Sequence, residues 1–322
     1  MHLCWGNPEA GQTDMRREEH KVKAGRRYVI YLSKYRSILA LSACLITITF
    51  SFYGIAGGIV LYTKDGMSAG LLFEWFTTIS NSITCLSACM ITPFAVEGIR
   101  RKHFSFPKWI SLFLYAGMVC TTLTMVMSVG FMSWTDPELA FGGYNTYLHI
   151  VCPVMVIISF FMVESGFRYT VKDALMATVP TFLYVMVYSF EVVIVGEENG
   201  GWEDIYHVMD YMPVAVAAVG VPLVAFGISL LIMLFNNIRV KRRRRKLMSS
   251  LWPKGVSPAI INVEVFGLGR YMGKHSDIEF VELYMDIIND IATYYDIKAE
   301  DLVRPYIKGY LDSFNEKNNP KV

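Results

Sequence analysis

The stretch Ser37–Thr63, with the sequence SILALSACLITITFSFYGIAGGIVLYT, runs for 27 residues without an Asp, Glu, Lys or Arg. A helix that spans a membrane needs about 20 consecutive apolar residues. Helices in the cores of soluble proteins rarely stay apolar on every face for so long. The stretch from Tyr211 to Ile238 also lacks charged residues. These two stretches predict an integral membrane protein.

Six apolar stretches of this length occur along the chain. The composition agrees, because 53% of the 322 residues are hydrophobic and only 18% are charged, whereas a typical soluble domain is about 25% charged. Six cysteines in a chain of this length do not form a disulfide framework. We therefore expect an all-α fold, a six-helix transmembrane bundle. The predicted spans are Ser37–Tyr62, Ala69–Val96, Trp109–Trp134, Tyr144–Val163, Ala174–Val195 and Met212–Ile238.

Basic residues alternate between successive loops. Lys and Arg cluster before the first span, after the second, after the fourth and after the sixth, whereas the other three loops contain only Lys64. Cytoplasmic loops carry an excess of Lys and Arg, so the pattern predicts a multi-pass protein of the cell membrane with both termini in the cytoplasm. The expected parts are a basic N-terminal segment (1–36), the bundle (37–238), a basic juxtamembrane linker (239–248) and a cytoplasmic tail (249–322).

The tail has the pattern of a small, mainly helical domain. Asn262–Phe266 alternates as a short strand would, and Phe280–Tyr295 and Leu302–Phe314 each place apolar residues on one face at helical spacing. We expect a helical hairpin, which packs on the bundle, on itself or on a cytoplasmic protein partner. The basic run Arg239–Lys246 is typical of the boundary after a last span, so we expect anionic membrane lipid and no nucleic acid as its partner.

The sequence contains no convincing cofactor or metal motif. In Gly267-Leu-Gly269-Arg-Tyr-Met-Gly273 the third glycine is one place late for a dinucleotide loop, and no βαβ unit surrounds it. Five of the six cysteines are scattered over four spans without a ligand set. We therefore expect neither a cofactor nor a metal.

A few polar groups interrupt the spans, and such groups are candidates for a functional site. From the predicted orientation, all of them fall in the outer half of the membrane, with Thr77 roughly 12 Å and His149 and Glu191 roughly 8 Å below the outer ends of their spans. This common depth predicts one outward-facing cavity. Four residues of the second span share one helical face, namely Glu74, Thr77, Thr78 and Asn81. The candidates are Glu74, Thr77, Thr78, Ser80, Asn81, His149 and Glu191.

These groups match the needs of nucleophilic catalysis. Thr77 or Thr78 would attack, His149 would accept the proton, and either carboxylate would orient the imidazole. Ser80 or Asn81 would donate a hydrogen bond to an oxyanion. The alternative is ordinary packing, in which hydroxyl and amide groups bond to the backbone or to a neighbouring helix.

Two short motifs resemble a known superfamily. Phe76-Thr-Thr-Ile-Ser-Asn81 and His149-Ile-Val-Cys-Pro153 are similar to segments of a six-span superfamily that includes the androgen-induced family of animal membrane hydrolases and bacterial relatives of unassigned function. The segment from Gly201 to Tyr206 resembles the aromatic-rich outer segment of that group. The resemblance covers residues 35–240, and the spacing from histidine to proline is one residue shorter than in the animal members.

The resemblance implies an intramembrane threonine nucleophile and a histidine. By motif position these are Thr77 and His149, with Thr78 as the alternative nucleophile. The animal members cleave fatty acid esters of hydroxy fatty acids, so the leading hypothesis is a hydrolase of lipid esters. The alternatives are a transporter or small-ligand-binding protein that uses the same cavity, and a membrane scaffold whose tail recruits a partner.

Overall fold

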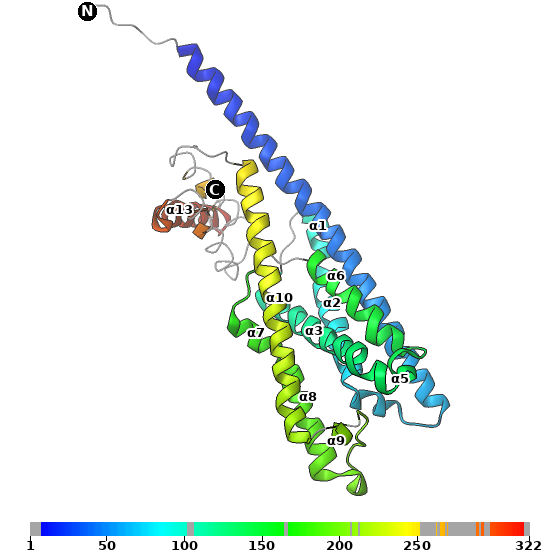
Figure 1. The fold of residues 1–322 in the computed structure, drawn as a ribbon. Helices are drawn as coiled ribbons and strands as arrows, with labels where there is room; N and C mark the ends of the chain where they lie inside the picture. Colours follow the sequence, from blue (N-terminus) through cyan, green and yellow to red (C-terminus); the bar gives the residue numbers. More distant parts are fainter. Residues whose placement is uncertain are drawn as a thin grey trace, which may run out of the picture. The chain divides into compact units, whose positions relative to one another are not determined.

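The computed structural model of the chain is helical in every secondary-structure element that it describes (Figure 1). This confirms the predicted all-α class for the described part of the chain. The chain divides into two compact units, Met1–Phe106 with Ile110–Ser165 and Leu175–Ser229, and Pro107–Trp109 with Gly166–Ala174 and Leu230–Val322. The described residues are 8–101, 106–163, 167–206, 208–211, 213–251, 262, 265–267, 269, 288–289, 291–292 and 297–318.

From α1 to α10 the helical elements follow one another with short connections. Three π-helical segments extend or open longer helices, and two short 3-10 helices lie in the connections. The elements are α1 (Pro8–Lys64), η1 (Ala69–Glu74), α2 (Phe76–Arg101), α3 (Lys108–Met127), η2 (Ser128–Met132), α4 (Ser133–Thr135), α5 (Pro137–Phe141), η3 (Tyr147–Val151), α6 (Cys152–Val163), α7 (Val171–Ala177), α8 (Val179–Ser189), η4 (Phe190–Val195), η5 (Glu197–Asn199), α9 (Val208–Tyr211), α10 (Val214–Leu251) and α13 (Ala299–Asn318).

Five described helices are long and apolar enough to cross a membrane. They correspond to the first, second, third, fifth and sixth predicted spans. The predicted fourth span forms a shorter apolar helix, Tyr147–Val163. The five spanning helices are Ser37–Lys64, Phe76–Arg100, Lys108–Thr135, Val171–Val195 and Val214–Arg243.

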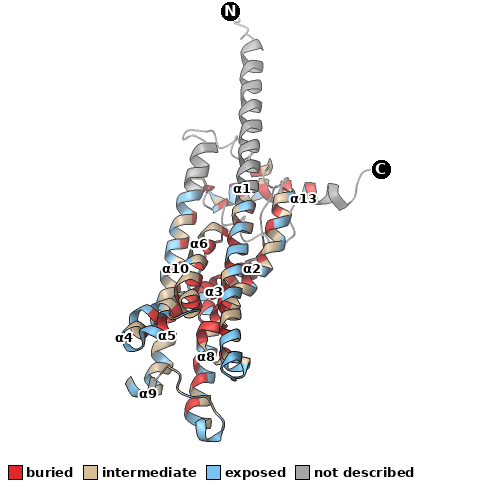
Figure 2. Ribbon diagram, turned by 90° about the vertical axis from the view of Figure 1, so that its right-hand side faces the viewer, coloured by how far each residue is buried: buried red, intermediate tan, exposed pale blue. Residues whose placement is uncertain are grey.

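Burial distinguishes a central helix from lipid-facing ones (Figure 2). In α3, 67% of the apolar window is buried, whereas in the α10 window only 17% is buried. Large apolar side chains such as Phe52 and Leu223 are 69% and 63% exposed. Exposed apolar surface on this scale is unfavourable in water. It suits contact with lipid, so the chain is an integral membrane protein.

Hydroxyl groups join the helices of the first unit. The Thr47 hydroxyl of α1 donates to the Ser159 hydroxyl of α6 at 2.9 Å, and Ser159 donates to the Ala43 carbonyl at 3.2 Å. The Tyr115 hydroxyl of α3 lies 2.6 Å from the Ser229 carbonyl of α10. In lipid the hydrophobic effect does not hold helices together, and interhelical hydrogen bonds such as these stabilise the bundle instead.

The second predicted span begins later than the sequence indicated. Trp75 is extended, with φ −82° and ψ 125°, and this breaks the helix. Glu74 therefore ends the 3-10 helix η1, while Thr77 is the second residue of α2. The prediction that Glu74 shares a helical face with Thr77 and Asn81 is wrong. Glu74 belongs to η1 and the other two residues belong to α2, and the extended residue Trp75 separates these helices.

In the second unit, two adjacent amides bind an extended stretch of backbone. Asn237 exchanges two hydrogen bonds with the backbone of Tyr169, at 2.9 and 2.7 Å. Asn236 donates to the Phe167 carbonyl at 3.0 Å. The predicted linker 239–248 continues α10 as helix, since nothing in its sequence breaks a helix.

The tail agrees with the prediction in part. Helix α13 covers Leu302–Phe314, but Ile307 and Leu311 are 47% and 49% exposed, so the buried face is narrower than predicted. Of the predicted strand, the described positions 262 and 265–266 are helical, which corrects that assignment. Most of the predicted helix Phe280–Tyr295 lies outside the described residues, as does much of 249–298.

Candidate functional site

Aromatic side chains hold the break between η1 and α2. The Phe76 amide, at the first position of α2, donates to the Tyr206 hydroxyl at 2.9 Å, and the Tyr184 hydroxyl donates to the Glu74 carbonyl at 2.7 Å. The Trp75 and Tyr206 rings lie 5.5 Å apart. Backbone groups on both sides of the break are thus bound by phenols, which fixes the first turn of α2.

Tyr206 remains a neutral phenol at physiological pH. Burial raises the pKa of its hydroxyl to about 12, although hydrogen bonds with Tyr184, Phe76 and Thr77 act in the opposite direction. A neutral hydroxyl can accept the Phe76 N–H and still donate its own proton.

His149 lies on η3, a π-helical segment that leads into Cys152 and Pro153 of α6. Its Nδ1 atom is 2.7 Å from the Ala140 carbonyl oxygen of α5. A carbonyl oxygen only accepts, so Nδ1 carries a hydrogen and donates it. In the neutral ring, Nε2 is therefore the free acceptor.

Helix α5 is itself fixed by capping. The Asp136 carboxylate accepts the Leu139 amide at 2.9 Å as an N-cap, and Pro137 occupies the first turn, where its missing N–H costs nothing. The Asn145 side chain donates to the Leu139 carbonyl at 2.9 Å. These bonds place the Ala140 carbonyl opposite the imidazole.

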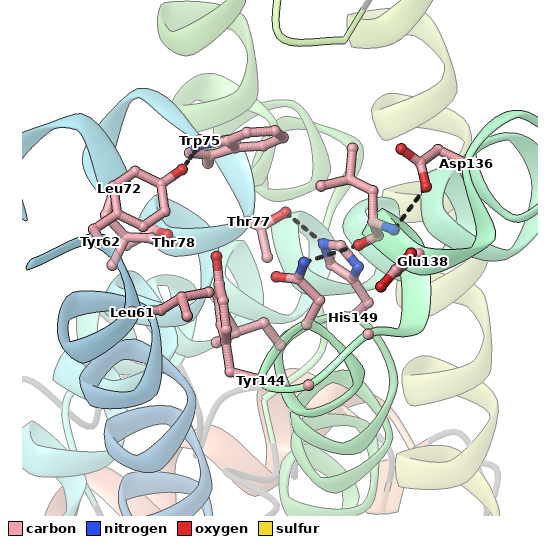
Figure 3. Close-up of a pocket in the computed structure, with 15 residues that line it drawn as sticks. Leu61, Tyr62, Leu72, Trp75, Thr77, Thr78, Asp136, Glu138, Tyr144 and His149 are labelled. Carbon is pink, nitrogen blue, oxygen red and sulfur yellow. Dashed lines mark hydrogen bonds between the residues drawn. The ribbon is translucent and has the colours of Figure 1, made fainter. Parts of the chain in front are cut away.

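Thr77 and His149 meet in the interior of the first unit. Thr77 Oγ1 is 3.1 Å from His149 Nε2, and the side chains are only 6% and 3% exposed. Figure 3 shows the two side chains pointing at each other from α2 and η3. With Nδ1 occupied, the Thr77 hydroxyl donates its proton to Nε2. This is the arrangement of a hydroxyl activated by a neighbouring base.

The pair lines a cavity of about 530 Å³. Its walls come from the end of α1, from η1 and α2, and from the segment between α4 and η3, all within the first unit. The lining is part apolar and part polar, as ligand sites usually are. The lining residues are Leu61, Tyr62, Leu72, Trp75, Thr77, Thr78, Asp136, Glu138, Leu139, Gly142, Gly143, Tyr144, Asn145, Leu148 and His149.

Thr78 also lines the cavity, but it does not contact His149. Its Oγ1 atom is buried, with the residue 1% exposed, and has no hydrogen-bond partner among the described residues. A buried hydroxyl without a partner is costly. Among the described residues, the Thr78 hydroxyl is therefore an unpartnered polar group in the wall of the cavity.

The proposed oxyanion donors Ser80 and Asn81 have other partners. The Ser80 hydroxyl donates to the Thr77 carbonyl at 2.9 Å and lies 3.1 Å from the Thr124 hydroxyl. Asn81 uses both amide hydrogens on the carbonyls of Thr77 and Leu148. Neither residue lines the cavity. Both residues therefore follow the alternative interpretation, in which polar side chains in the spans bond to the backbone or to a neighbouring helix, because a carbonyl lies within reach of each donor.

Glu74 and Glu191 do not orient the imidazole, which corrects that prediction. Neither lines the cavity, and the Ala140 carbonyl occupies His149 Nδ1. Partial burial, followed by the nearby carboxylate of Glu191, raises the pKa of Glu74 above its usual range. The Glu191 carboxylate therefore acts on Glu74, and the break at Trp75 keeps Glu74 out of α2.

Sequence reasoning missed several parts of the site. The Ala140 carbonyl carries no signal, since every residue has one. Asp136 could have been found, because Asp-Pro is a recognisable helix start, although its place in the cavity could not. Among the described residues, no three His, Cys, Asp or Glu side chains gather as a metal site requires.

We compared the chain with protein-family models, with curated proteins and with solved structures, and none of them matched it.

Proposed function

We propose that this membrane protein hydrolyses lipid esters, with Thr77 as nucleophile and His149 as general base. The observation that supports this proposal best is the buried 3.1 Å contact between Thr77 Oγ1 and His149 Nε2. The Ala140 carbonyl selects the tautomer that leaves Nε2 as the acceptor. The cavity gives both groups access to a ligand.

The reaction follows from these positions. Thr77 Oγ1 attacks the ester carbonyl carbon while its proton passes to His149 Nε2. The bond from this carbon to the alcohol oxygen then breaks, and Nε2 returns the proton to the leaving alcohol. A water molecule next attacks the acyl-threonine, with its proton taken by Nε2 and delivered to Thr77 Oγ1, and the fatty acid leaves.

Thr78 is the proposed oxyanion donor in place of Ser80 and Asn81. Its hydroxyl is buried, lines the cavity and lacks a partner among the described residues. Loss of one oxyanion-hole donor typically lowers kcat about 10²- to 10³-fold. The first turn of α2 adds the positive end of a helix dipole near the same position.

For topology, we propose six spans with both termini in the cytoplasm and the cavity open to the outside. Five spans alone would place the two termini on opposite sides of the membrane. With Tyr147–Val163 as a sixth span, both termini lie on the same side. The cavity walls include the end of α1 and the segment around α5, which belong to the loops that are poor in Lys and Arg.

The decisive experiment is labelling of the purified full chain with a fluorophosphonate probe, in which an activated hydroxyl displaces fluoride from phosphorus. We expect Thr77→Ala and His149→Ala to abolish labelling, Thr77→Ser to retain it, and Thr78→Val to slow it at an unchanged site. Mass spectrometry of the labelled peptide identifies the modified residue. Labelling that persists in Thr77→Ala contradicts the proposed nucleophile.

A ligand-binding protein is the second candidate, since the same cavity would serve it. It predicts that purified protein binds an ester analogue with equal affinity in wild type and Thr77→Ala, and that neither form releases fatty acid. Turnover of a lipid ester that depends on Thr77 excludes this candidate.

A further inference from the structure

The cavity has a fixed negative charge. Asp136 and Glu138 are the lining residues with carboxylates, and none of the lining residues is a Lys or Arg. His149 adds no positive charge in the neutral form that donates from Nδ1 and accepts at Nε2. A ligand with its own carboxylate or phosphate would therefore meet like charge.

Both carboxylates are able to receive a cation. Both residues are exposed and line the cavity. Asp136 accepts the Leu139 amide through Oδ1 alone, and the Glu138 carboxylate has no ion-pair partner among the described residues. Carboxylates at such a position attract and orient a positive group.

The two ends of the cavity differ in chemistry. In Figure 3, Leu61, Leu72 and Trp75 lie on one side of the Thr77–His149 pair, and Asp136 and Glu138 lie on the other side, beyond the imidazole. The side of Leu61, Leu72 and Trp75 is the one without a charged group, although it also carries Tyr62, Thr78 and Tyr144, and we place the acyl chain there. The alcohol part then points past the imidazole, which must return a proton to it, and toward the carboxylates.

An independent feature indicates that a ligand occupies this space. The Thr78 hydroxyl is buried, lines the cavity and has no partner among the described residues. A ligand atom that accepts a hydrogen bond from this hydroxyl would satisfy it.

From these observations, and resting on the proposed hydrolase function, we infer that the substrate is a fatty acyl ester whose alcohol part carries a positive charge, an ammonium or quaternary ammonium group. Thr77 and His149 act on the ester, and Asp136 and Glu138 bind the cationic alcohol. Esters whose alcohol part carries a carboxylate are poor substrates, and these include the fatty acid esters of hydroxy fatty acids that the resemblance implied, so the inference departs from that expectation.

The test compares three esters of one fatty acid, with choline, ethylene glycol and glycolic acid as the alcohol, on the full chain in a neutral detergent. We expect kcat/KM to be about tenfold higher for the choline ester than for the glycol ester, and lowest for the glycolate ester, in line with one or two exposed charge contacts. Added salt should reduce the preference, because these carboxylates are exposed.

Two variants assign the preference to the carboxylates. Glu138→Gln and Asp136→Asn should each lower the choline-to-glycol ratio about threefold, and Asn retains the N-cap acceptor. Glu198→Gln, an exposed acid outside the cavity, should leave the ratio unchanged. Because the ratio is internal to each protein, a partly unfolded preparation does not alter it.

The outcomes separate the two proposals. Hydrolysis of all three esters at equal rates, dependent on Thr77, overturns the inference and leaves the hydrolase standing. If no ester is hydrolysed, the hydrolase proposal fails, and binding to Thr77→Ala then tests the inference. Tighter binding of tetradecyltrimethylammonium than of tetradecanoate supports the cation site, and equal binding overturns it.

Discussion

The side-chain amide of Asn81 donates to the carbonyls of Thr77 and Leu148, at 2.8 and 3.2 Å. The first carbonyl belongs to the opening turn of α2, and the second directly precedes His149 on η3. One buried side chain therefore connects the two segments that carry the candidate pair. Sequence alone identified Asn81 as polar and buried, but not which two carbonyls it binds.

We expect Asn81→Leu to lower the free energy of unfolding by about 1–3 kcal/mol, because the Leu148 and Thr77 carbonyls each lose one donor, although the Ser80 hydroxyl still donates to Thr77. It should also slow probe labelling of Thr77, since the contact with His149 is no longer fixed. Thermal unfolding in detergent and labelling rates measure the two effects. Ser82→Ala, which removes a bond only within α2, is the matched control. An Asn81→Leu protein with wild-type melting temperature and labelling contradicts this role.

At the scale of elements, the glycines of α1 allow η3 to approach. A Cβ atom on Gly54 would lie 2.4 Å from Leu148 Cδ2, and one on Gly58 would lie 3.0 Å from Leu72. Leu148 is 1% exposed and has little room to move. Gly54 and Gly58 therefore serve packing within the chain.

We expect Gly54→Val to destabilise the protein by about 1–3 kcal/mol through overpacking. It should also displace η3, and with it His149, so that labelling is reduced. Gly220→Ala on α10, where a Cβ meets nothing within 4 Å, should be neutral. Melting temperatures of the two variants decide the matter, and adding Leu148→Ala to Gly54→Val should restore part of the loss. Equal stability of Gly54→Val and wild type would refute the close approach.

The start of α2 depends on a phenol from a distant segment. Tyr206→Phe removes the acceptor of the Phe76 amide, so we expect slower labelling of Thr77 and a loss of about 1–3 kcal/mol. Tyr53→Phe is the control, because Tyr53 is 57% exposed and contacts Tyr147 through its ring. Hydrogen exchange at the first turn of α2 should rise in Tyr206→Phe alone. Unchanged exchange there would show that the phenol does not hold the turn.

At the scale of the whole molecule, the number of crossings decides the topology. If Tyr147–Val163 spans the membrane, Lys172 lies in the cytoplasm and Glu198 outside. We expect an impermeant maleimide, added to intact cells, to label Glu198→Cys and not Lys172→Cys in a cysteine-free background. Both positions are exposed, so disruption of the cells should make Lys172→Cys reactive. Labelling of Lys172→Cys in intact cells would mean that this helix does not cross.

The sequence by itself determined that this protein lies in a membrane, and it determined the approximate positions of its helices along the chain. Long uncharged stretches cannot stay in water, and each helix in lipid must satisfy its own backbone, so both properties are local. The same locality made His149 a candidate, since an ionisable group in an apolar stretch is conspicuous.

Only the tertiary structure decided which groups meet. Thr77 and His149 are 72 residues apart along the chain, and their contact depends on the break at Trp75, the Tyr206 hydroxyl and the glycines of α1. The Ala140 carbonyl of α5 replaced the expected carboxylates, because it lies 2.7 Å from His149 Nδ1. Contacts of this kind depend on the packing of distant segments, and no local pattern records that packing.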